Sequence, residues 1–207
     1  GSKQHLYVDS TPEYLYHPDT SKQIFEVQPS AKMIVLIRDP VKRAYSAWNH
    51  YRQLFENDLY IETIKNYPRR EGNLLYEKFF HERSSFPPFR ECIDIELDLI
   101  DRNIGFEPAL LRRGLYLAQL QNYWEYFDKS QIMIIGFQDF VKDTIGTLSK
   151  VTTFVRAKDI SWNNITFEAK NVREYTEQMS DKDRKVCECF FKEPNQKLFE
   201  IIDRVNW

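Results

Sequence analysis

Glycine is scarce in this sequence, with six among 207 residues, whereas aromatic residues make up 15% of it. This balance argues against a disordered or low-complexity chain, and the length suits one globular domain with a real core. The formal net charge is only −2, so nothing global indicates nucleic acid or a membrane surface as the main partner. No apolar run reaches the roughly 18–20 residues that are needed to cross a bilayer.

Cysteine is also rare, and the three that occur are Cys92, Cys187 and Cys189. They have neither the number nor the spacing of a disulfide framework or a zinc site, so we expect three free thiols. No other cluster of ligand-type residues is visible in the sequence, and no metal is expected.

Apolar periodicity predicts an α/β chain. Helices are expected over 21–27, 40–55, 109–127, 144–155 and 181–204, with an amphipathic stretch over 89–100. Two short apolar runs, 33–37 and 132–135, predict strands, and the first lacks alternation, as in a strand covered on both faces. Strands that alternate with helices favour a parallel sheet. The stretch from 56 to 108 is the least regular part.

The most informative segment follows the first predicted strand. The strand ends on Arg38, turns through Asp39-Pro40, and enters a helix that presents Arg43 and Ser46. A guanidinium at the carboxyl end of a strand, beside the free N–H groups and positive dipole end of a new helix, is suited to hold a phosphate.

This segment resembles the 3′-phosphate-binding segment of sulfotransferases that use 3′-phosphoadenosine 5′-phosphosulfate (PAPS). Three further segments resemble parts of carbohydrate-type members in the same order. They are Thr11-Pro-Glu-Tyr-Leu-Tyr-His-Pro18, Arg113-Gly-Leu-Tyr116 with the helix behind it, and Phe191-x-x-Pro-Asn-Gln-x-Leu198 with Trp207 beyond.

The resemblance implies a P-loop-like three-layer fold, with a central parallel sheet flanked by helices, in a single sulfotransferase domain over 1–207. It implies transfer of a sulfonate from PAPS to a hydroxyl or amine, with a carbohydrate as the expected acceptor and the stretch 56–108 shaping acceptor choice. Arg69, Arg70 and Arg83 in that stretch either meet an anionic glycan or are ordinary surface charges. The sequence does not identify the compartment; the expectation is the cytoplasm if the source is bacterial and the Golgi lumen if it is eukaryotic.

The resemblance also assigns cofactor-binding residues. Arg38 and Ser46 match the arginine and serine that bind the 3′-phosphate, and Arg43 faces either that phosphate or solvent. Tyr116, with Arg112-Arg113-Gly114 before it at the start of the predicted helix, matches a region near cofactor and acceptor. Gly114 in a helical pattern further indicates close packing against a neighbour. Lys170 and Arg173 fall where the family places a basic loop over the phosphates, although the Lys-Gly-Arg wording of that loop is absent.

Asp9 is the candidate general base. Heparan-type members carry a glutamate at this point, and a carboxylate there takes the proton from an acceptor hydroxyl as it attacks sulfur. Aspartate is one methylene shorter, and Asp9 before Ser-Thr-Pro also suits a helix cap. Glu13 and His17 are the alternative bases.

One expected element is missing from the sequence. The glycine-rich loop that cradles the 5′-phosphosulfate in this family has no counterpart here. We therefore expect the domain to be N-terminally incomplete. The chain alone is expected to bind the nucleotide but not to catalyse sulfonate transfer. The alternative is a non-catalytic nucleotide-binding or scaffold protein derived from the same fold.

Overall fold

The computed structural model describes the chain except for residues 1–5, 60, 67–72, 106–108, 158–160, 163–164, 168–176 and 204. Backbone contacts divide the chain into two compact units. The sheet unit comprises Gly1–Arg38, Tyr116–Val172 and Leu198–Trp207, and the helical unit comprises Asp39–Leu115 and Arg173–Lys197. Each unit is built from segments that are far apart in the sequence. The expectation of a single domain stays a prediction.

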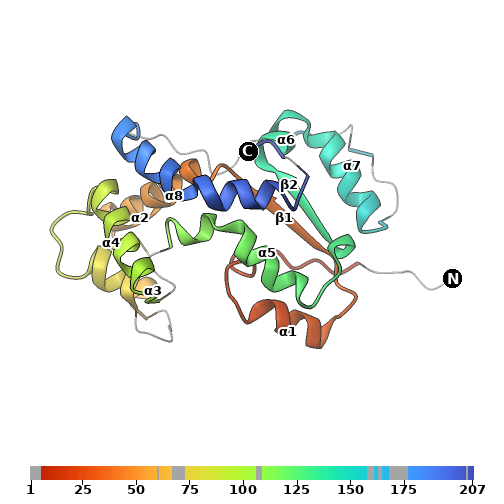
Figure 1. Ribbon diagram of the computed structural model, residues 1–207, viewed down its shortest axis with the longest axis horizontal. Coiled ribbons are helices and arrows are strands. Elements are labelled where there is room, and N and C mark those ends of the chain that lie inside the picture. Colours follow the sequence, from red (N-terminus) through yellow and green to blue (C-terminus); the bar gives the residue numbers. More distant parts are fainter. Residues whose placement is uncertain are drawn as a thin grey trace. The chain divides into compact units, whose positions relative to one another are not determined.

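The sheet unit is organised around two parallel strands. β1 (Met33–Ile37) pairs with β2 (Ile132–Gly136), in a register that sets Met33 opposite Ile132 and Ile37 opposite Gly136. Helices α1 (Thr20–Val27) and α5 (Tyr116–Trp124) lie on one side of this pair, and α6 (Phe137–Lys142) and α7 (Thr144–Phe154) lie on the other (Figure 1). The predicted parallel pairing and helix-flanked sheet are confirmed.

The core of the sheet unit lies on one face of β1. Val35 and Ile37 point into it, and they meet the buried residues Tyr116, Leu120, Tyr123, Phe127, Ile132 and Leu198. Ile34 and Leu36, on the opposite face, remain 45% and 48% exposed. The prediction that β1 is covered on both faces is therefore wrong. α5 packs against the inner face of β1. On the outer face, where α6 and α7 lie, the described residues leave Ile34 and Leu36 about half exposed.

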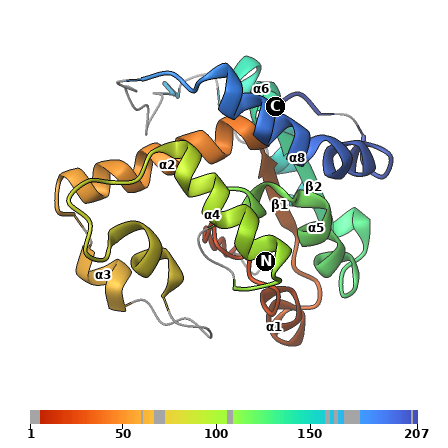
Figure 2. The ribbon, with the colours of Figure 1, turned by 60° about the vertical axis from the view of Figure 1, so that its left-hand side comes forward.

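The helical unit contains α2 (Pro40–Glu56), α3 (Ile61–Asn66), a π-helical turn (Tyr76–Phe80), α4 (Phe89–Asp101), a 3-10 turn (Arg112–Gly114) and most of α8 (Asp181–Phe199). Both ribbon views place α2 beside α4 (Figure 2). An aromatic-rich core joins these elements, and it includes Tyr45, Trp48, Phe79, Phe80, Phe86, Phe89, Ile93, Leu110 and Phe191.

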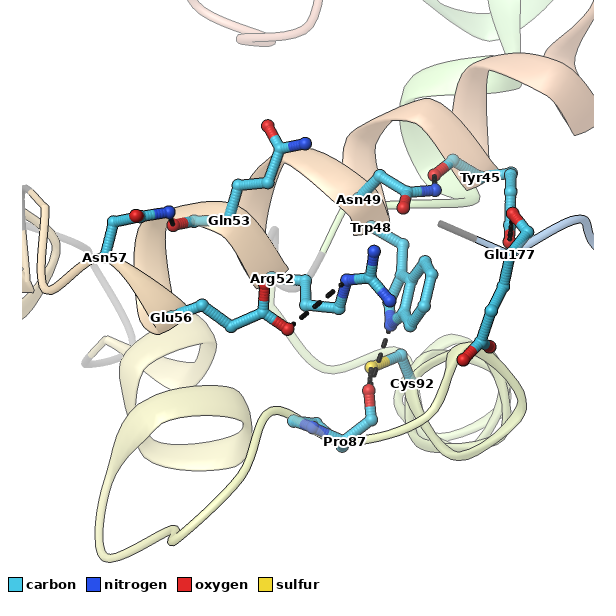
Figure 3. Close-up of polar contacts among 10 residues, drawn as sticks. All are labelled: Tyr45, Trp48, Asn49, Arg52, Gln53, Glu56, Asn57, Pro87, Cys92 and Glu177. Atoms are coloured by element: carbon cyan, nitrogen blue, oxygen red, sulfur yellow. Dashed lines mark hydrogen bonds and ion pairs between the residues drawn. The ribbon is translucent and has the colours of Figure 1, made fainter. Parts of the chain in front are cut away.

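The polar tips of the buried aromatic side chains on α2 have partners (Figure 3). The Trp48 indole N–H donates to the Pro87 carbonyl at 2.9 Å, and the Tyr45 hydroxyl donates to the Glu177 carbonyl at 2.8 Å. The thiol of Cys92 also donates to the Pro87 carbonyl. Because buried donors without partners are costly, these bonds let large aromatic rings fill the core.

The three cysteines are free thiols, as predicted. Cys92 and Cys187 are buried, whereas Cys189 is exposed on the other side of α8. Burial raises the pKa of the Cys92 thiol and raises that of Cys187 to about 12, so both stay protonated and inert at neutral pH.

Two predicted helices differ from the observed ones. The helix expected over 109–127 is broken, because a 3-10 turn covers Arg112–Gly114 and α5 begins only at Tyr116. The last helix ends at Phe199 rather than near residue 204. The strands and the helices α1, α2, α4 and α7 lie within two residues of their predicted ends.

Candidate functional site

Arg38 stands at the carboxyl end of β1, one residue beyond the last pair of the strand ladder. Its side chain is partly buried, and the guanidinium lies over the Phe137 ring, 5.4 Å from the ring centroid. Phe137 opens α6 directly after β2, so the ends of both strands contribute to this contact. Among the described residues, the guanidinium has no carboxylate or hydrogen-bond partner. A cation held over an aromatic ring, with no counter-ion in the part of the chain that the structure describes, is suited to receive an anion.

Tyr116 holds the backbone of Arg38. Its hydroxyl donates to the Arg38 carbonyl at 2.8 Å and accepts from the Arg38 amide N–H at 3.3 Å. The tyrosine is only 5% exposed. The structure thus brings together two residues that the sequence assigns to one cofactor site, and the contact runs through the Arg38 main chain.

The C-terminal segment closes around the same strand ends. Asn206 donates to the Asp139 carboxylate through its backbone N–H at 2.9 Å and through its side chain at 2.6 Å. These bonds, the side-chain one first, hold the pKa of Asp139 below its ordinary value. Gly136 is required here, because a Cβ would lie 2.1 Å from the Asn206 carbonyl oxygen. Trp207 then lies against the Tyr116 ring, at 6.3 Å between centroids.

The helical unit presents the residues that follow Arg38 in the sequence. The Asp39 carboxylate caps α2 by accepting from the N–H groups of Val41 at 2.9 Å and Lys42 at 3.2 Å. Ser46 is partly buried on α2, and its hydroxyl has no hydrogen-bond partner in the described part of the chain. The roles of Arg38 and Ser46 in phosphate binding stay predictions.

Arg43 faces neither open solvent nor a free pocket. Its guanidinium donates to the Ala109 carbonyl at 3.1 Å and also to the Leu110 carbonyl. These bonds tie α2 to the segment before the 3-10 turn. The predicted contact with the cofactor would have to compete with them.

Sequence reasoning missed the buried carboxylate of Glu96. Glu96 on α4 is 1% exposed, and its two oxygens accept from three consecutive backbone N–H groups, those of Leu110, Leu111 and Arg112, at 2.7–2.9 Å. Arg112 in turn donates to carbonyls near the end of α4. The sequence signal that could have identified this buried carboxylate is a glutamate at a position within the apolar stripe of a helix.

Gly114 packs tightly, as its presence in a helical pattern indicated. A Cβ at this position would lie 2.7 Å from the Pro40 side chain and 2.8 Å from the Phe191 ring. The glycine therefore allows the 3-10 turn to approach the first turn of α2 and the middle of α8. This contact explains the glycine at position 114 in structural terms.

Asp9 is exposed and bonded locally. Its carboxylate accepts from the Tyr14 hydroxyl and the Thr11 hydroxyl, both at 2.8 Å. These bonds, that of Tyr14 first, lower the pKa of Asp9. The carboxylate is therefore ionised at neutral pH, as a general base must be, but it is also a weaker proton acceptor. The alternative bases are Glu13 and His17, and the Glu13 Oε2 atom lies 3.7 Å from the His17 Nε2 atom.

The remaining predicted basic residues divide into two groups. Arg83 forms an ion pair with Glu91 at 2.9 Å, which favours its role as a surface charge. The others, Arg69, Arg70, Lys170 and Arg173, lie outside the described residues.

A surface hollow of about 660 Å³ lies along α4, and none of the predicted cofactor-binding or catalytic residues is among those that line it. Two ion pairs within α4 lie in its lining, that of Arg90 with Asp94 and that of Arg102 with Asp98. The described residues contain no group of three or more His, Cys, Asp or Glu that could hold a metal ion. None of the helices in the described part of the chain has the length and apolarity to cross a membrane.

The comparisons with known proteins agree with this architecture. The sulfotransferase domain family matches residues 16–193, which is more than half of the chain, and the chain belongs to this family. Over 93% of its length it superposes on the crystal structure of a sulfotransferase from Alicyclobacillus acidocaldarius, with a TM-score of 0.61 and 23% identity, covering 62% of that chain. This similarity supports the α/β P-loop-like fold.

Two curated relatives match almost the whole chain. The membrane-associated sulfotransferase kil1 of Dictyostelium discoideum is 22% identical over 97% of this chain and 53% of its own length. Human carbohydrate sulfotransferase 15 is 24% identical over 94% of this chain and 33% of its own. Mouse heparan sulfate glucosamine 3-O-sulfotransferase 6 is 25% identical over 75% of this chain and 36% of its own. The chain thus spans about a third to a half of the length of these relatives.

Proposed function

We propose that this chain is part of a sulfotransferase that takes PAPS as donor and transfers its sulfonate to a hydroxyl or amine of a carbohydrate. The observation that carries the proposal is Arg38, a cation at the end of a parallel strand, stacked on Phe137 and without an anionic partner among the described residues. Family membership and the names of the carbohydrate and heparan sulfate relatives support the reaction and the acceptor class.

The residues present fit the nucleotide end of such a donor. Arg38 would take the 3′-phosphate through its planar fork of N–H groups, which matches phosphate oxygens in a bidentate way. The resemblance to the family assigns Ser46 to the same phosphate as one hydroxyl donor. PAPS itself supplies an activated sulfonate and a phosphate leaving group. The chain's contribution is therefore to bind and orient the nucleotide, and to accept a proton at the Asp9 carboxylate.

The donor is tested by equilibrium binding. The chain should bind adenosine 3′,5′-bisphosphate, and adenosine 5′-phosphate, which lacks only the 3′-phosphate, is the matched control. A charged hydrogen bond to the 3′-phosphate predicts a preference of roughly ten- to hundredfold for the bisphosphate. Equal affinity for the two nucleotides would contradict the assignment of a 3′-phosphate site.

The acceptor is tested by transfer. The whole protein, incubated with radiolabelled PAPS and a panel of heparan and chondroitin fragments, should move the label to at least one glycan. Binding of the bisphosphate without transfer to any acceptor in the panel would favour the alternative, a non-catalytic nucleotide-binding protein of the same fold.

A further inference from the structure

The peptide groups of Arg38 lie where the sheet can no longer pair them. The β1–β2 ladder ends with Ile37 opposite Gly136, so the next N–H and C=O need partners from elsewhere. The Tyr116 hydroxyl supplies both, accepting from the N–H at 3.3 Å and donating to the C=O at 2.8 Å. One side-chain oxygen thus takes the place of a neighbouring strand as the hydrogen-bond partner of the residue that follows β1.

We propose that Tyr116 is a positioning residue, which sets the direction of the Arg38 guanidinium through the Arg38 main chain and contributes to 3′-phosphate selectivity without touching the nucleotide. This inference rests on the proposed function of Arg38. It replaces the direct cofactor contact that the sequence predicted for Tyr116 with an indirect one.

The surroundings explain how a main-chain contact can orient a long side chain. Arginine has many rotamers, and its Cα–Cβ direction decides which of them reach a given point. Tyr116 fixes that direction at one end, and stacking on Phe137 fixes the guanidinium at the other. With both ends fixed, little conformational freedom remains to be lost when an anion binds, and this favours affinity.

The Tyr116 ring is itself held in place. It is 5% exposed in the core of the sheet unit, and Trp207 lies against it at 6.3 Å between centroids. The residue before Trp207, Asn206, is fixed to Asp139 on α6, the helix that starts with Phe137. The two aromatic residues that constrain Arg38 are therefore connected through the C-terminal segment.

The experiment compares Tyr116→Phe with Tyr123→Phe. Tyr123 is a matched control because it lies on the same helix, is 4% exposed, and donates its hydroxyl hydrogen bond to a backbone carbonyl, that of Tyr14, at 2.8 Å. Each variant removes one buried oxygen atom. Affinities for adenosine 3′,5′-bisphosphate and adenosine 5′-phosphate are measured in both variants, together with their unfolding midpoints.

Tyr116→Phe should weaken bisphosphate binding roughly three- to tenfold, the range of one neutral hydrogen bond, and leave adenosine 5′-phosphate binding unchanged. Tyr123→Phe should lower the unfolding midpoint about as much as Tyr116→Phe does, but it should keep the parent's preference for adenosine 3′,5′-bisphosphate over adenosine 5′-phosphate. An equal effect of Tyr116→Phe on both nucleotides, or no effect on either, would show that the tyrosine has only a structural role and would overturn the proposal.

A double variant separates indirect from direct action. In an Arg38→Ala background, adding Tyr116→Phe should change bisphosphate affinity less than twofold, since the group that Tyr116 positions is gone. If the full three- to tenfold loss persists there, Tyr116 contacts the nucleotide itself and the positioning role is wrong.

Failure of the proposed function has a different signature. If the parent chain does not prefer the bisphosphate, Arg38 does not bind the 3′-phosphate. The effect of Tyr116 on the orientation of Arg38 is then tested separately, by the NMR resonance of the Arg38 side-chain Nε–H. A resonance that loses its ring-current shift from Phe137 in Tyr116→Phe, and keeps it in Tyr123→Phe, supports positioning. A resonance unchanged in both variants overturns it.

Discussion

Asp9 is held by two hydroxyl groups, and this arrangement makes a specific prediction about catalysis. Asp9→Asn keeps the size of the side chain and removes the proton acceptor, so turnover of the whole protein should fall by roughly 10²- to 10⁴-fold with nucleotide affinity nearly unchanged. Glu13→Gln and His17→Gln are the matched controls. An asparagine variant that stays active while the His17 variant is dead would assign the base to His17.

The pH profile adds a second test of the same residue. The Tyr14 and Thr11 hydroxyls keep the Asp9 carboxylate ionised by lowering its pKa, so this base contributes no loss of turnover between about pH 5 and 8. Imidazoles generally change charge within that range, and a histidine base would make turnover fall on its acid side. Kinetics over this interval therefore discriminate between the two chemistries.

Gly114 gives a prediction about packing. In Gly114→Ala the new methyl group would meet the Pro40 side chain at 2.7 Å and the Phe191 ring at 2.8 Å, so something has to shift. Overpacking of this kind costs about 1–3 kcal/mol of the free energy of unfolding. Urea denaturation measures it, with the exposed Ser85→Ala as a control that should stay within about 0.5 kcal/mol. Equal stability of the two variants would contradict the tight packing of the turn.

At the scale of elements, α2 depends on its N-terminal cap. Asp39→Ala removes the acceptor of two N–H groups, those of Val41 and Lys42, and should lower the free energy of unfolding by about 1 kcal/mol. Asp39→Asn retains an acceptor oxygen and should keep most of that stability. Denaturant unfolding of both variants checks the cap, and an alanine variant as stable as the parent would show that the cap contributes nothing.

The C-terminal segment should be anchored in a pH-dependent way. Because the Asn206 bonds lower the folded-state pKa of Asp139 below its ordinary value of 3.8, they stabilise the anchored segment above that value. Their contribution is lost as the pH falls through the lower, folded-state pKa. The Asn206 amide resonances should therefore move in acid, below about pH 4.

A neutral side chain should remove this pH dependence. In Asp139→Asn the Asn206 resonances should no longer follow the titration, whereas Asp203→Asn, a change at an exposed nearby carboxylate, should leave it intact. A titration that is the same in Asp139→Asn as in the parent would assign the movement to another group.

At the scale of the whole molecule, the helices and strands could be predicted from the sequence better than the tertiary contacts between them. Met33–Ile37 could be placed because the apolar run is bounded by Lys32 and Arg38, and α2 because Asp39-Pro40 is a strong helix start. These signals are local, and local signals decide where regular structure begins and ends.

The missed features all depend on distant partners. The helix predicted over 109–127 is interrupted at Gly114, where the chain packs against Pro40 and Phe191 from distant parts of the sequence. Glu96, on another helix, accepts from three N–H groups just before this point. The exposure of Ile34 depends on which elements cover the sheet, and the Tyr116–Arg38 contact joins residues 78 positions apart. Periodicity in one sequence contains no information about such partners.

The central claim, that Arg38 binds the 3′-phosphate of the donor nucleotide, is tested most directly by calorimetry on Arg38→Ala. The control is Lys129→Ala, which also removes a cation stacked on an aromatic ring of the sheet unit, that of Trp124, at 4.8 Å. Arg38→Ala should fold and lose about 1.5–3 kcal/mol of adenosine 3′,5′-bisphosphate binding, the range of a charged hydrogen bond, while Lys129→Ala binds as the parent does. A folded Arg38→Ala chain with unchanged affinity for the bisphosphate would contradict the claim.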